Sequence, residues 1–277
     1  MSENQETHQD KIIKLKRQFL EEIASERDSY HDDDIERINL DDWNVERYLL
    51  HCKDDVNTAL VMLRESMKWR KSYGVNDLKE TDFPREYYTS GSFFSYAPDK
   101  KGNEMVYIRG KLHRKIAEWS ELKKKFFVFK INQLDRRNGG RRYAAFWDCE
   151  GAGLCNVDMD VLSFMLSTVS QYFPYGLEYV LIVDLPLVLT TLYNLAKRWV
   201  PEYYQRLAII INRDKVTDHI DRNNLPQYLG GVCKMDEKYP PPGVVSAQEI
   251  EKRNDMPPGS ADKLETYLKQ YCLSPNS

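Results

Sequence analysis

The chain has 277 residues, of which 42% are hydrophobic and 30% are charged, and its formal net charge is −3. These values are typical of a globular protein with room for one large domain and a smaller one. A net negative charge argues against a general nucleic-acid-binding protein. The first residues, MSENQETHQDK, are polar and acidic, whereas an export signal needs a basic start and an apolar centre. We therefore expect a cytoplasmic protein without a nucleic-acid partner.

Metal and catalytic signatures are absent from the sequence. The five cysteines are odd in number and lack the paired short spacings of a zinc site, so free thiols in a reducing compartment are expected. Asp158 and Asp160 fit the start of a helix, which favours acidic side chains, better than a metal site. No Gly-x-Ser-x-Gly, His-Glu-x-x-His or dinucleotide-binding glycine pattern occurs. We predict no metal, no cofactor and no catalytic residue.

Charge is distributed unevenly along the chain. Residues 1–46 hold 14 acidic and 6 basic residues, a net charge of −8, whereas residues 100–142 hold 14 basic and 4 acidic residues, a net charge of +10. Such a region attracts anionic lipid or an acidic partner, although solvated helix faces would give the same count. Arg141 and Arg142 close the glycine turn RRNGGRR, and guanidinium groups bind phosphates well. They are candidate contacts with an anionic membrane, and a solvated turn is the alternative.

The first 75 residues predict a small helical bundle. In residues 11–24, Ile12, Leu15, Phe19 and Ile23 recur at helical spacing. Two further segments with apolar residues three and four apart follow, and Gly74 ends the second of them; these segments are 43–52 and 54–75.

From residue 76 the pattern changes to strands that alternate with helices. A hairpin precedes a long helix, and short apolar strands separated by helices then imply parallel pairing with right-handed crossovers. The predicted strands are 92–97, 104–110, 142–148, 179–184 and 207–212, and the predicted helices are 119–137, 158–173, 187–200 and 216–224. We predict an α/β domain over 76–232. The proline-rich residues 233–277 predict a flexible tail with one terminal helix near 261–271.

The predicted helix at 187–200 has two apolar stripes. They lie about 100° apart on a helical wheel, whereas an ordinary surface helix needs only one. The second stripe would contact a lipid or a membrane, or else a second layer of protein core. The stripes are Val188, Leu192, Leu195 and Trp199, and Leu189, Tyr193, Ala196 and Val200.

Several motifs resemble the CRAL-TRIO family of lipid-binding proteins. RYLLHCKDDVNTALVMLRESMKWRKSYGV resembles the family's N-terminal helical module and includes its Trp-Arg pair, here Trp69 and Arg70. WDCEGAGLCNVDMD, YFPYGLEYVLIVDLP and NNLPQYLGG follow in the family's order, so that the match covers residues 40–232. The resemblance implies a protein without enzymatic activity and an α/β fold in which a helical bundle precedes a mixed or parallel sheet. It also implies that one lipid lies between the sheet and a mobile gate helix.

Carried onto this sequence, the resemblance identifies the gate helix as residues 187–200. It implies a peripheral membrane protein that serves lipid transfer or membrane attachment. The implied lipid contacts are Leu189, Tyr193 and Ala196 on the gate helix, Tyr143, Ala145 and Trp147 on the sheet floor, and Val180, Ile182, Leu207 and Ile209 at equivalent positions on the next strands. The stripe of Val188, Leu192, Leu195 and Trp199 would face the bilayer during lipid exchange.

The chain departs from relatives that bind phosphatidylinositol. Those relatives hold the headgroup with a glutamate and a lysine at the positions of Tyr175 and Leu207, and they place small hydroxyl residues at Tyr143 and Ala145. We therefore expect a neutral or weakly polar lipid, or a phospholipid whose headgroup stays near the mouth, rather than phosphatidylinositol held by that charge pair. One alternative is a protein-interaction module whose pocket is filled by Tyr143, Trp147 and Tyr193, with the basic region as its partner surface. Another is an enzyme acting on a small apolar substrate.

Overall fold

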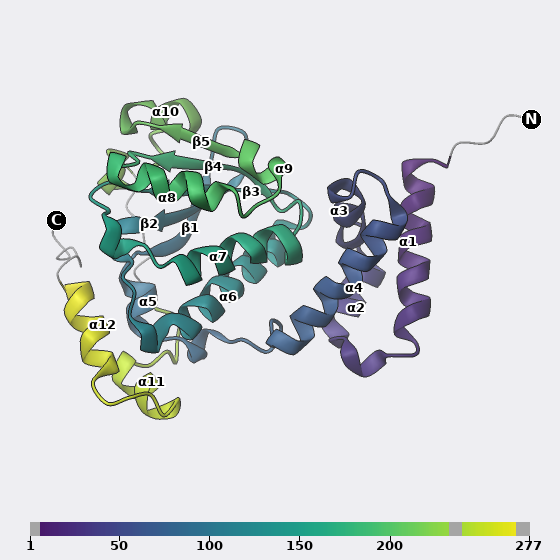
Figure 1. Ribbon diagram of the computed structural model, residues 1–277, viewed down its shortest axis with the longest axis horizontal. Helices are drawn as coiled ribbons and strands as arrows, with labels where there is room; N and C mark the ends of the chain where they lie inside the picture. The colour runs from purple at the N-terminus through teal and green to yellow at the C-terminus, as the bar shows by residue number, and fades with distance from the viewer. Residues whose placement is uncertain (1–5, 233–239, 270–277) are drawn as a thin grey trace, which may run out of the picture.

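Four helices at the N-terminus lie beside a five-stranded sheet in the computed structural model, which describes residues 6–232 and 240–269 (Figure 1). The apolar stripe Ile12, Leu15, Phe19 and Ile23 of α1 is buried, and a capping box between Thr7 and Asp10 starts the helix. The last helix ends at Gly74, whose φ of 71° suits glycine. The predicted helical module is thus confirmed, with helices α1 (His8–Ile23), α2 (Asp32–Leu40), α3 (Trp43–His51) and α4 (Val56–Tyr73).

The sheet is mixed, in agreement with the predicted fold class. Its strands follow one another in chain order, β1 and β2 pair antiparallel, and the remaining neighbours pair parallel. The strands are β1 (Phe93–Pro98), β2 (Glu104–Arg109), β3 (Tyr143–Asp148), β4 (Leu177–Val183) and β5 (Ala208–Ile211).

The two faces of the sheet are covered differently. On one face, alternate strand residues such as Tyr107, Phe146 and Leu181 pack tightly against α10 and the segment that follows it. Three helices, α6, α7 and α8, cover the other face (Figure 1), and α7 continues into a π-helical turn at Thr168–Tyr172. The helices around the sheet are α6 (Ser120–Asn138), α7 (Met159–Ser167), α8 (Leu187–Lys197), α9 (Glu202–Arg206) and α10 (Val216–His219), so that the helix predicted at 216–224 is shorter than expected.

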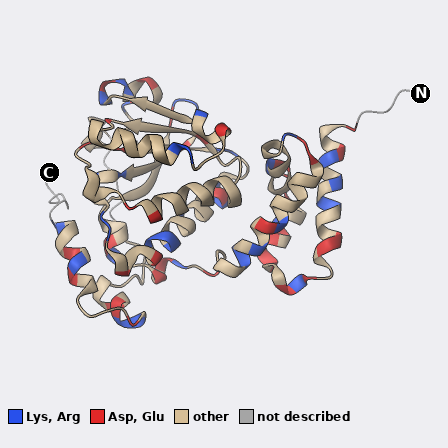
Figure 2. Cartoon of the chain, viewed as in Figure 1, with Lys and Arg blue, Asp and Glu red and all other residues tan. Residues whose placement is uncertain are grey.

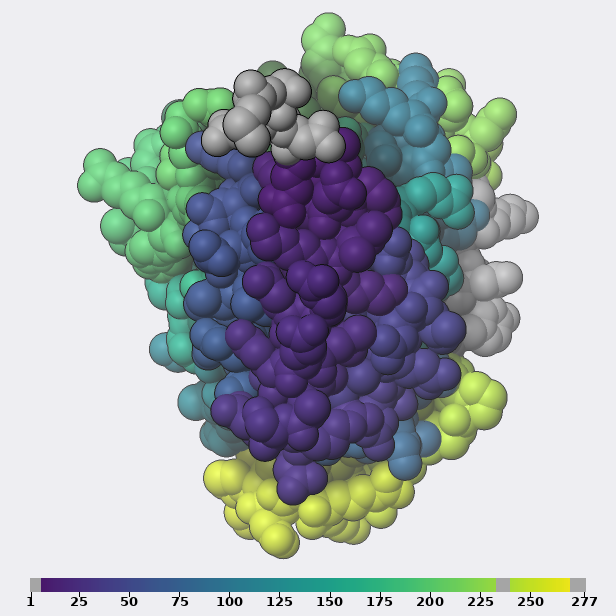
Figure 3. Space-filling view, turned by 90° about the vertical axis from the view of Figure 1, so that its right-hand side faces the viewer, coloured from purple at the N-terminus to yellow at the C-terminus, as the bar shows by residue number. Residues whose placement is uncertain are grey.

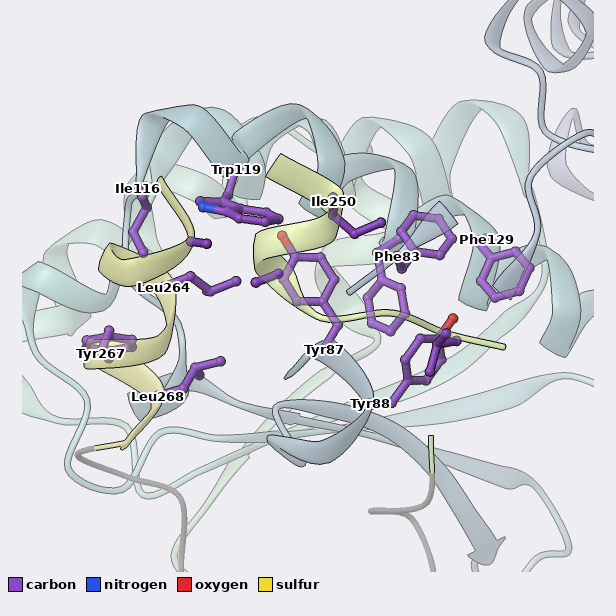
Figure 4. Close-up of a cluster of buried hydrophobic side chains, with 14 residues drawn as sticks. Phe83, Tyr87, Tyr88, Ile116, Trp119, Phe129, Ile250, Leu264, Tyr267 and Leu268 are labelled. Atoms are coloured by element: carbon purple, nitrogen blue, oxygen red, sulfur yellow. The ribbon is translucent and has the colours of Figure 1, made fainter. Parts of the chain in front are cut away.

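The C-terminal region is folded onto the domain, and the prediction of a flexible tail is wrong for residues 240–269. Helices α11 (Ala247–Arg253) and α12 (Ser260–Lys269) pack against α5 (Arg85–Thr89) and the start of α6 (Figure 4). Trp119 is fully buried there, and its Nε1 donates to Ser260 O at 2.8 Å. The prolines interrupt the region, but apolar residues at helical spacing still bury themselves. The terminal helix predicted at 261–271 corresponds to α12, and its last residues lie outside the described part. The other domain limits stay predictions.

Buried polar groups fix the N-terminal module to the domain, and the module occupies the centre of one face of the molecule (Figure 3). Arg70 is 2% exposed and makes two hydrogen bonds with Asp34, at 2.9 and 2.8 Å, while its Nη2 also donates to Asn132 of α6 at 2.9 Å. Trp69 stacks on Tyr172 with ring centroids 3.9 Å apart. The Trp-Arg pair therefore joins the two parts of the chain.

Candidate functional site

A cavity of about 360 Å³ lies between the sheet and helices α6, α7 and α8. Its floor is a set of strand residues that alternate with those of the packed face. Val106, Ala145, Val180 and Ala208 are paired across four strands and form one row of this floor. The remaining floor residues are Ile108, Tyr143, Trp147, Leu177 and Ile182. The register of the parallel strands thus gathers side chains far apart in sequence into one largely apolar surface.

Helix α8 forms part of the cavity wall and also exposes apolar side chains to solvent. Leu189, Leu192, Tyr193 and Ala196 line the cavity at the spacing of one helix face. On the outside of the helix and just beyond its end, large apolar residues are exposed, from 42% for Trp199 to 91% for Leu187, with Val188 and Leu195 between them. Few charged residues lie on α8 (Figure 2). This helix therefore has the two apolar sides that the sequence predicts.

Most predicted lipid contacts line the cavity, with corrections on two elements. Tyr143, Ala145, Trp147, Val180, Ile182, Leu189, Tyr193 and Ala196 do so. The placement of Leu207 and Ile209 beside Val180 and Ile182 is wrong by one residue, because β5 pairs Ala208 with Val180 and Ile209 with Leu181 of the packed face. Leu192 was expected on the outer stripe, but it lines the cavity beside Leu189 and Tyr193.

An aromatic cluster surrounds Tyr175, one of the two positions at which the family resemblance implies a headgroup charge pair. Tyr175 has a φ of 60°, which is uncommon for a residue other than glycine, and its ring stacks on Tyr203 at 5.6 Å. The Arg142 guanidinium lies 4.5 Å from the Tyr175 ring centroid and pairs with Glu178 at 2.8 Å. Leu207 is half-buried. Arg142 is therefore already engaged within the protein, whereas Arg141 is exposed.

Titratable side chains also line the cavity, and three of them, His113, Lys123 and Asp158, interact through their charges. His113 follows β2, Lys123 lies in the first turn of α6, and Asp158 is the N-cap of α7. Asp158 Oδ1 accepts from the backbone N–H groups of Asp160 and Val161, which confirms the predicted helix start. Burial lowers the pKa of Lys123 to about 8, against the effect of Asp158. Burial, aided by the charge of Lys123, lowers the pKa of His113 to about 4, so that its imidazole is neutral at pH 7.

Helix α12 forms a wall of the cavity that was not predicted from the sequence. Leu264, Tyr267 and Leu268 line the cavity, and their spacing of three and four residues is a signal that could have identified them. The Tyr267 hydroxyl lies 2.6 Å from Lys111 O and accepts from Asn156 Nδ2 at 2.9 Å. The C-terminal helix is therefore tied to the loop that follows β2.

Within residues 6–232 and 240–269, no group of three or more His, Cys, Asp or Glu side chains could hold a metal ion. No helix of the same residues is long and apolar enough to cross a membrane. One thiol, Cys149, lines the cavity, and burial raises its pKa to about 12. A thiol with this pKa is protonated at neutral pH and is a poor nucleophile.

Several known proteins are similar to this chain in sequence. It is 26% identical over 227 residues to the human tyrosine-protein phosphatase non-receptor type 9. This match covers 79% of this chain but only 37% of the phosphatase. It is 22% identical to the phosphatidylinositol transfer protein CSR1 of Eremothecium gossypii, over 78% of this chain and 50% of that protein. It is 24% identical to the Sec14 cytosolic factor of Schizosaccharomyces pombe, over 70% of this chain and 76% of that protein.

The fold itself recurs in a solved structure. The crystal structure of Sfh5 matches with a TM-score of 0.61 at 14% sequence identity, and the match covers 92% of this chain and 98% of the other. The CRAL/TRIO domain model matches residues 88–231, which is more than half of the chain and includes all five strands of the sheet. This chain therefore belongs to the CRAL/TRIO domain family.

Proposed function

We propose that this protein binds one lipid in the cavity beneath α8 and exchanges it at membrane surfaces, for lipid transfer or membrane attachment. The observation that carries this proposal is the cavity of about 360 Å³, which is lined mainly by apolar side chains and bounded by a helix that is apolar on both sides. Such a cavity suits the hydrocarbon part of a ligand. Two relatives are named as a phosphatidylinositol transfer protein and a Sec14 factor, which supports the same class of ligand.

The exposed face of α8 supports a role for this helix as a gate that contacts the membrane. Leu187, Val188, Leu195 and Trp199 form an exposed apolar patch that would gain free energy by entering a lipid interface. When α8 moves outward, Leu189 and Ala196 would leave their buried positions and open the cavity toward the bilayer.

We propose that the ligand is not phosphatidylinositol bound through the family's usual charge pair, because that pair is missing from this chain. Tyr175 is committed to a ring stack, Leu207 carries no charge, and Arg142 is paired with Glu178. An anionic headgroup at this position would have to displace those contacts. We also propose a closer relationship to the N-terminal lipid-binding part of motile sperm domain-containing protein 2, which the spacing of the motifs and the Tyr-Pro-Pro-Pro run at 239–242 resemble.

Native mass spectrometry of the protein after incubation with mixed-lipid vesicles tests lipid binding. One lipid added per protein chain is the expected result, and solvent extraction then gives its class. Protein that takes up no lipid from any vesicle would contradict the proposal and would favour the protein-interaction module. The open cavity argues against that alternative, because Tyr143, Trp147 and Tyr193 line the space without filling it.

Vesicle flotation tests the membrane-facing side of α8. The double substitution Leu195→Asp with Trp199→Asp places two charges on the outer face and should abolish flotation with vesicles while the far-UV circular dichroism stays unchanged. The matched control is Ile13→Asp, since Ile13 is 57% exposed on α1, far along the chain from α8. Equal loss of flotation in both variants, or in neither, would remove α8 from the mechanism.

The name of the phosphatase relative gives no support for an enzyme. The chain spans about 37% of the length of that protein, and the thiol in the cavity, Cys149, is held in its unreactive protonated form. We therefore propose a binding protein without catalytic activity.

A further inference from the structure

The cavity carries a polar cluster whose hydrogen-bonding capacity is only partly used. His113, Lys123 and Asp158 come from three different elements and all line the cavity. Their charges influence one another, since Lys123 lowers and Asp158 raises the pKa of His113. Lining residues around them are mainly apolar, including Ile116 and Val161. Ionisable groups are costly in such surroundings unless they have partners.

Asp158 shows most clearly that a partner is missing. Its side chain is 3% exposed, and Oδ1 is used as the cap of α7. Oδ2 is buried and accepts no hydrogen bond from any residue in the described ranges. Buried carboxylate oxygens normally have donors, so a donor on a bound molecule would complete this site.

The neighbouring groups could satisfy the other half of such a molecule. Lys123 Nζ donates to Arg114 O and retains further N–H groups, because an ammonium group has three donors. The neutral imidazole of His113 offers one donor and one acceptor, and no described residue forms a hydrogen bond with it. A hydroxyl group, which both donates and accepts, matches Asp158 as an acceptor and Lys123 or His113 as a donor.

The charge of the cluster favours an uncharged ligand group. At pH 7 the positive charge of Lys123 balances the negative charge of Asp158, and His113 is neutral. Three further cations, Arg109, Arg114 and Lys197, line other parts of the cavity. The Arg114 guanidinium lies 5.5 Å from the Tyr267 ring centroid. Arg109 lies 4.2 Å from the Tyr228 ring centroid. An ionised phosphate or carboxylate placed against the unpartnered oxygen of Asp158 would be repelled by this carboxylate, whereas a hydroxyl group would donate to it.

We infer, on the basis of the proposed lipid binding, that the lipid carries an uncharged hydroxyl group, as a diacylglycerol or a long-chain alcohol does, and that His113, Lys123 and Asp158 bind this hydroxyl. Asp158 Oδ2 accepts the hydroxyl proton, and Lys123 or His113 donates to the hydroxyl oxygen. The acyl or alkyl chains then lie along the apolar floor of the cavity.

Competitive uptake tests this inference. The protein is incubated with phosphatidylcholine vesicles that contain dioleoylglycerol, its methyl ether at the same hydroxyl, oleic acid or phosphatidylinositol, and bound lipid is quantified by native mass spectrometry. We expect dioleoylglycerol to be preferred over its methyl ether by about tenfold, the effect of one hydrogen bond to a charged group. Equal uptake of the alcohol and the ether, or preference for oleic acid or phosphatidylinositol, would overturn the inference while leaving lipid binding intact. No uptake of any lipid would overturn both.

Two substitutions locate the effect in the cluster. Asp158→Asn keeps a good helix cap and removes the charge, and Lys123→Met keeps the aliphatic stem. Asp158→Asn should reduce dioleoylglycerol uptake by about tenfold and leave uptake of the methyl ether unchanged, because only the hydroxyl donates to Asp158. Lys123→Met should reduce uptake of both lipids, because the ether oxygen can still accept a hydrogen bond from Lys123. Lys125→Met, an exposed position on the same helix, is the matched control and should behave as the wild type. A parallel fall for alcohol and ether in Asp158→Asn, or no fall for either lipid in Lys123→Met, would overturn the assigned roles.

Discussion

Two regions of this molecule bury charged side chains, and they do so in different ways. At the junction between the N-terminal module and the α/β domain, Arg70 is 2% exposed and bonded to Asp34, Asn76 and Asn132. In the cavity, Asp158 is almost as deeply buried but leaves Oδ2 unpartnered among the described residues. The first region is a closed hydrogen-bonded network and the second is an open one.

The difference separates structural charge from charge kept for a ligand. Pairing with Arg70 holds the pKa of Asp34 below its usual value although burial raises it, so the carboxylate is favoured in the folded protein. Lys123 and His113 instead have lowered pKa values, mainly because of burial, so their charged forms are disfavoured there. Unfavourable burial of this kind is common at functional sites.

Breaking the closed network should have the largest effect. Arg70→Met leaves the Asp34 carboxylate buried without its cation, and removal of one partner of a buried pair costs about 3–5 kcal/mol. Urea unfolding should therefore show a large fall in the free energy of unfolding. Arg64→Met, which removes a more exposed pair with Glu22, is the control and should cost about 1 kcal/mol or less. Similar losses in both variants would mean that the junction is not a closed network.

Acid should destabilise the open cluster through His113. The pKa of this imidazole falls from 6.5 to about 4 on folding, so the unfolded chain binds the proton first as the pH is lowered. The free energy of unfolding therefore keeps its full value, as far as His113 is concerned, above pH 6.5. It falls by up to about 3 kcal/mol as the pH is lowered toward 4. His113→Gln should lack this part of the acid dependence when unfolding is followed over the same pH range. An unchanged acid profile would show that His113 is accessible to solvent.

Much of the fold can be predicted from the sequence because its elements have strong periodic signals. The apolar stripe of α1 and the continuous apolar runs of β3 and β4 each indicate one type of structure, and their alternation predicts the parallel pairing. The C-terminal helices could not be recognised in this way. Their partners, such as Trp119 and Tyr87, lie more than 100 residues earlier, and prolines between the helices suggest a linker.

The candidate site can be predicted only where strand alternation or helical spacing places a residue. Tyr143, Ala145 and Trp147 follow from the alternation of one strand. The prediction for Leu207 and Ile209 is wrong because the register of β5 against β4 decides which residues face the cavity, and the sequence of β5 alone does not give this register. Lys123 lies in a run of three lysines, and the sequence gives no reason to place this particular lysine in the cavity.

Removing the half-buried Lys123 of the cavity should stabilise the protein modestly. The unfolded Lys123 takes up its proton near pH 10.5 but the folded one only near pH 8, so the charged form costs stability below pH 8. Lys123→Met should raise the free energy of unfolding at pH 7 by about 1 kcal/mol, after the loss of the contacts with Arg114 and Asp158. The gain should shrink as the pH rises from 7 toward 10.5. Destabilisation at pH 7 would identify Lys123 as a structural residue and would make the two charged regions alike.

Breaking the half-exposed ion pair between Arg142 and Glu178 should lower the free energy of unfolding least. Its side chains are 30% and 31% exposed, and the guanidinium also lies over the Tyr175 ring. Arg142→Gln should cost about 1 kcal/mol or less, because water solvates both partners once they separate. The cost should fall further in high salt, which screens exposed pairs but not the buried pair of Arg70. A salt-independent loss as large as that of Arg70→Met would mean that the aromatic cluster around Tyr175 is itself a closed structural network.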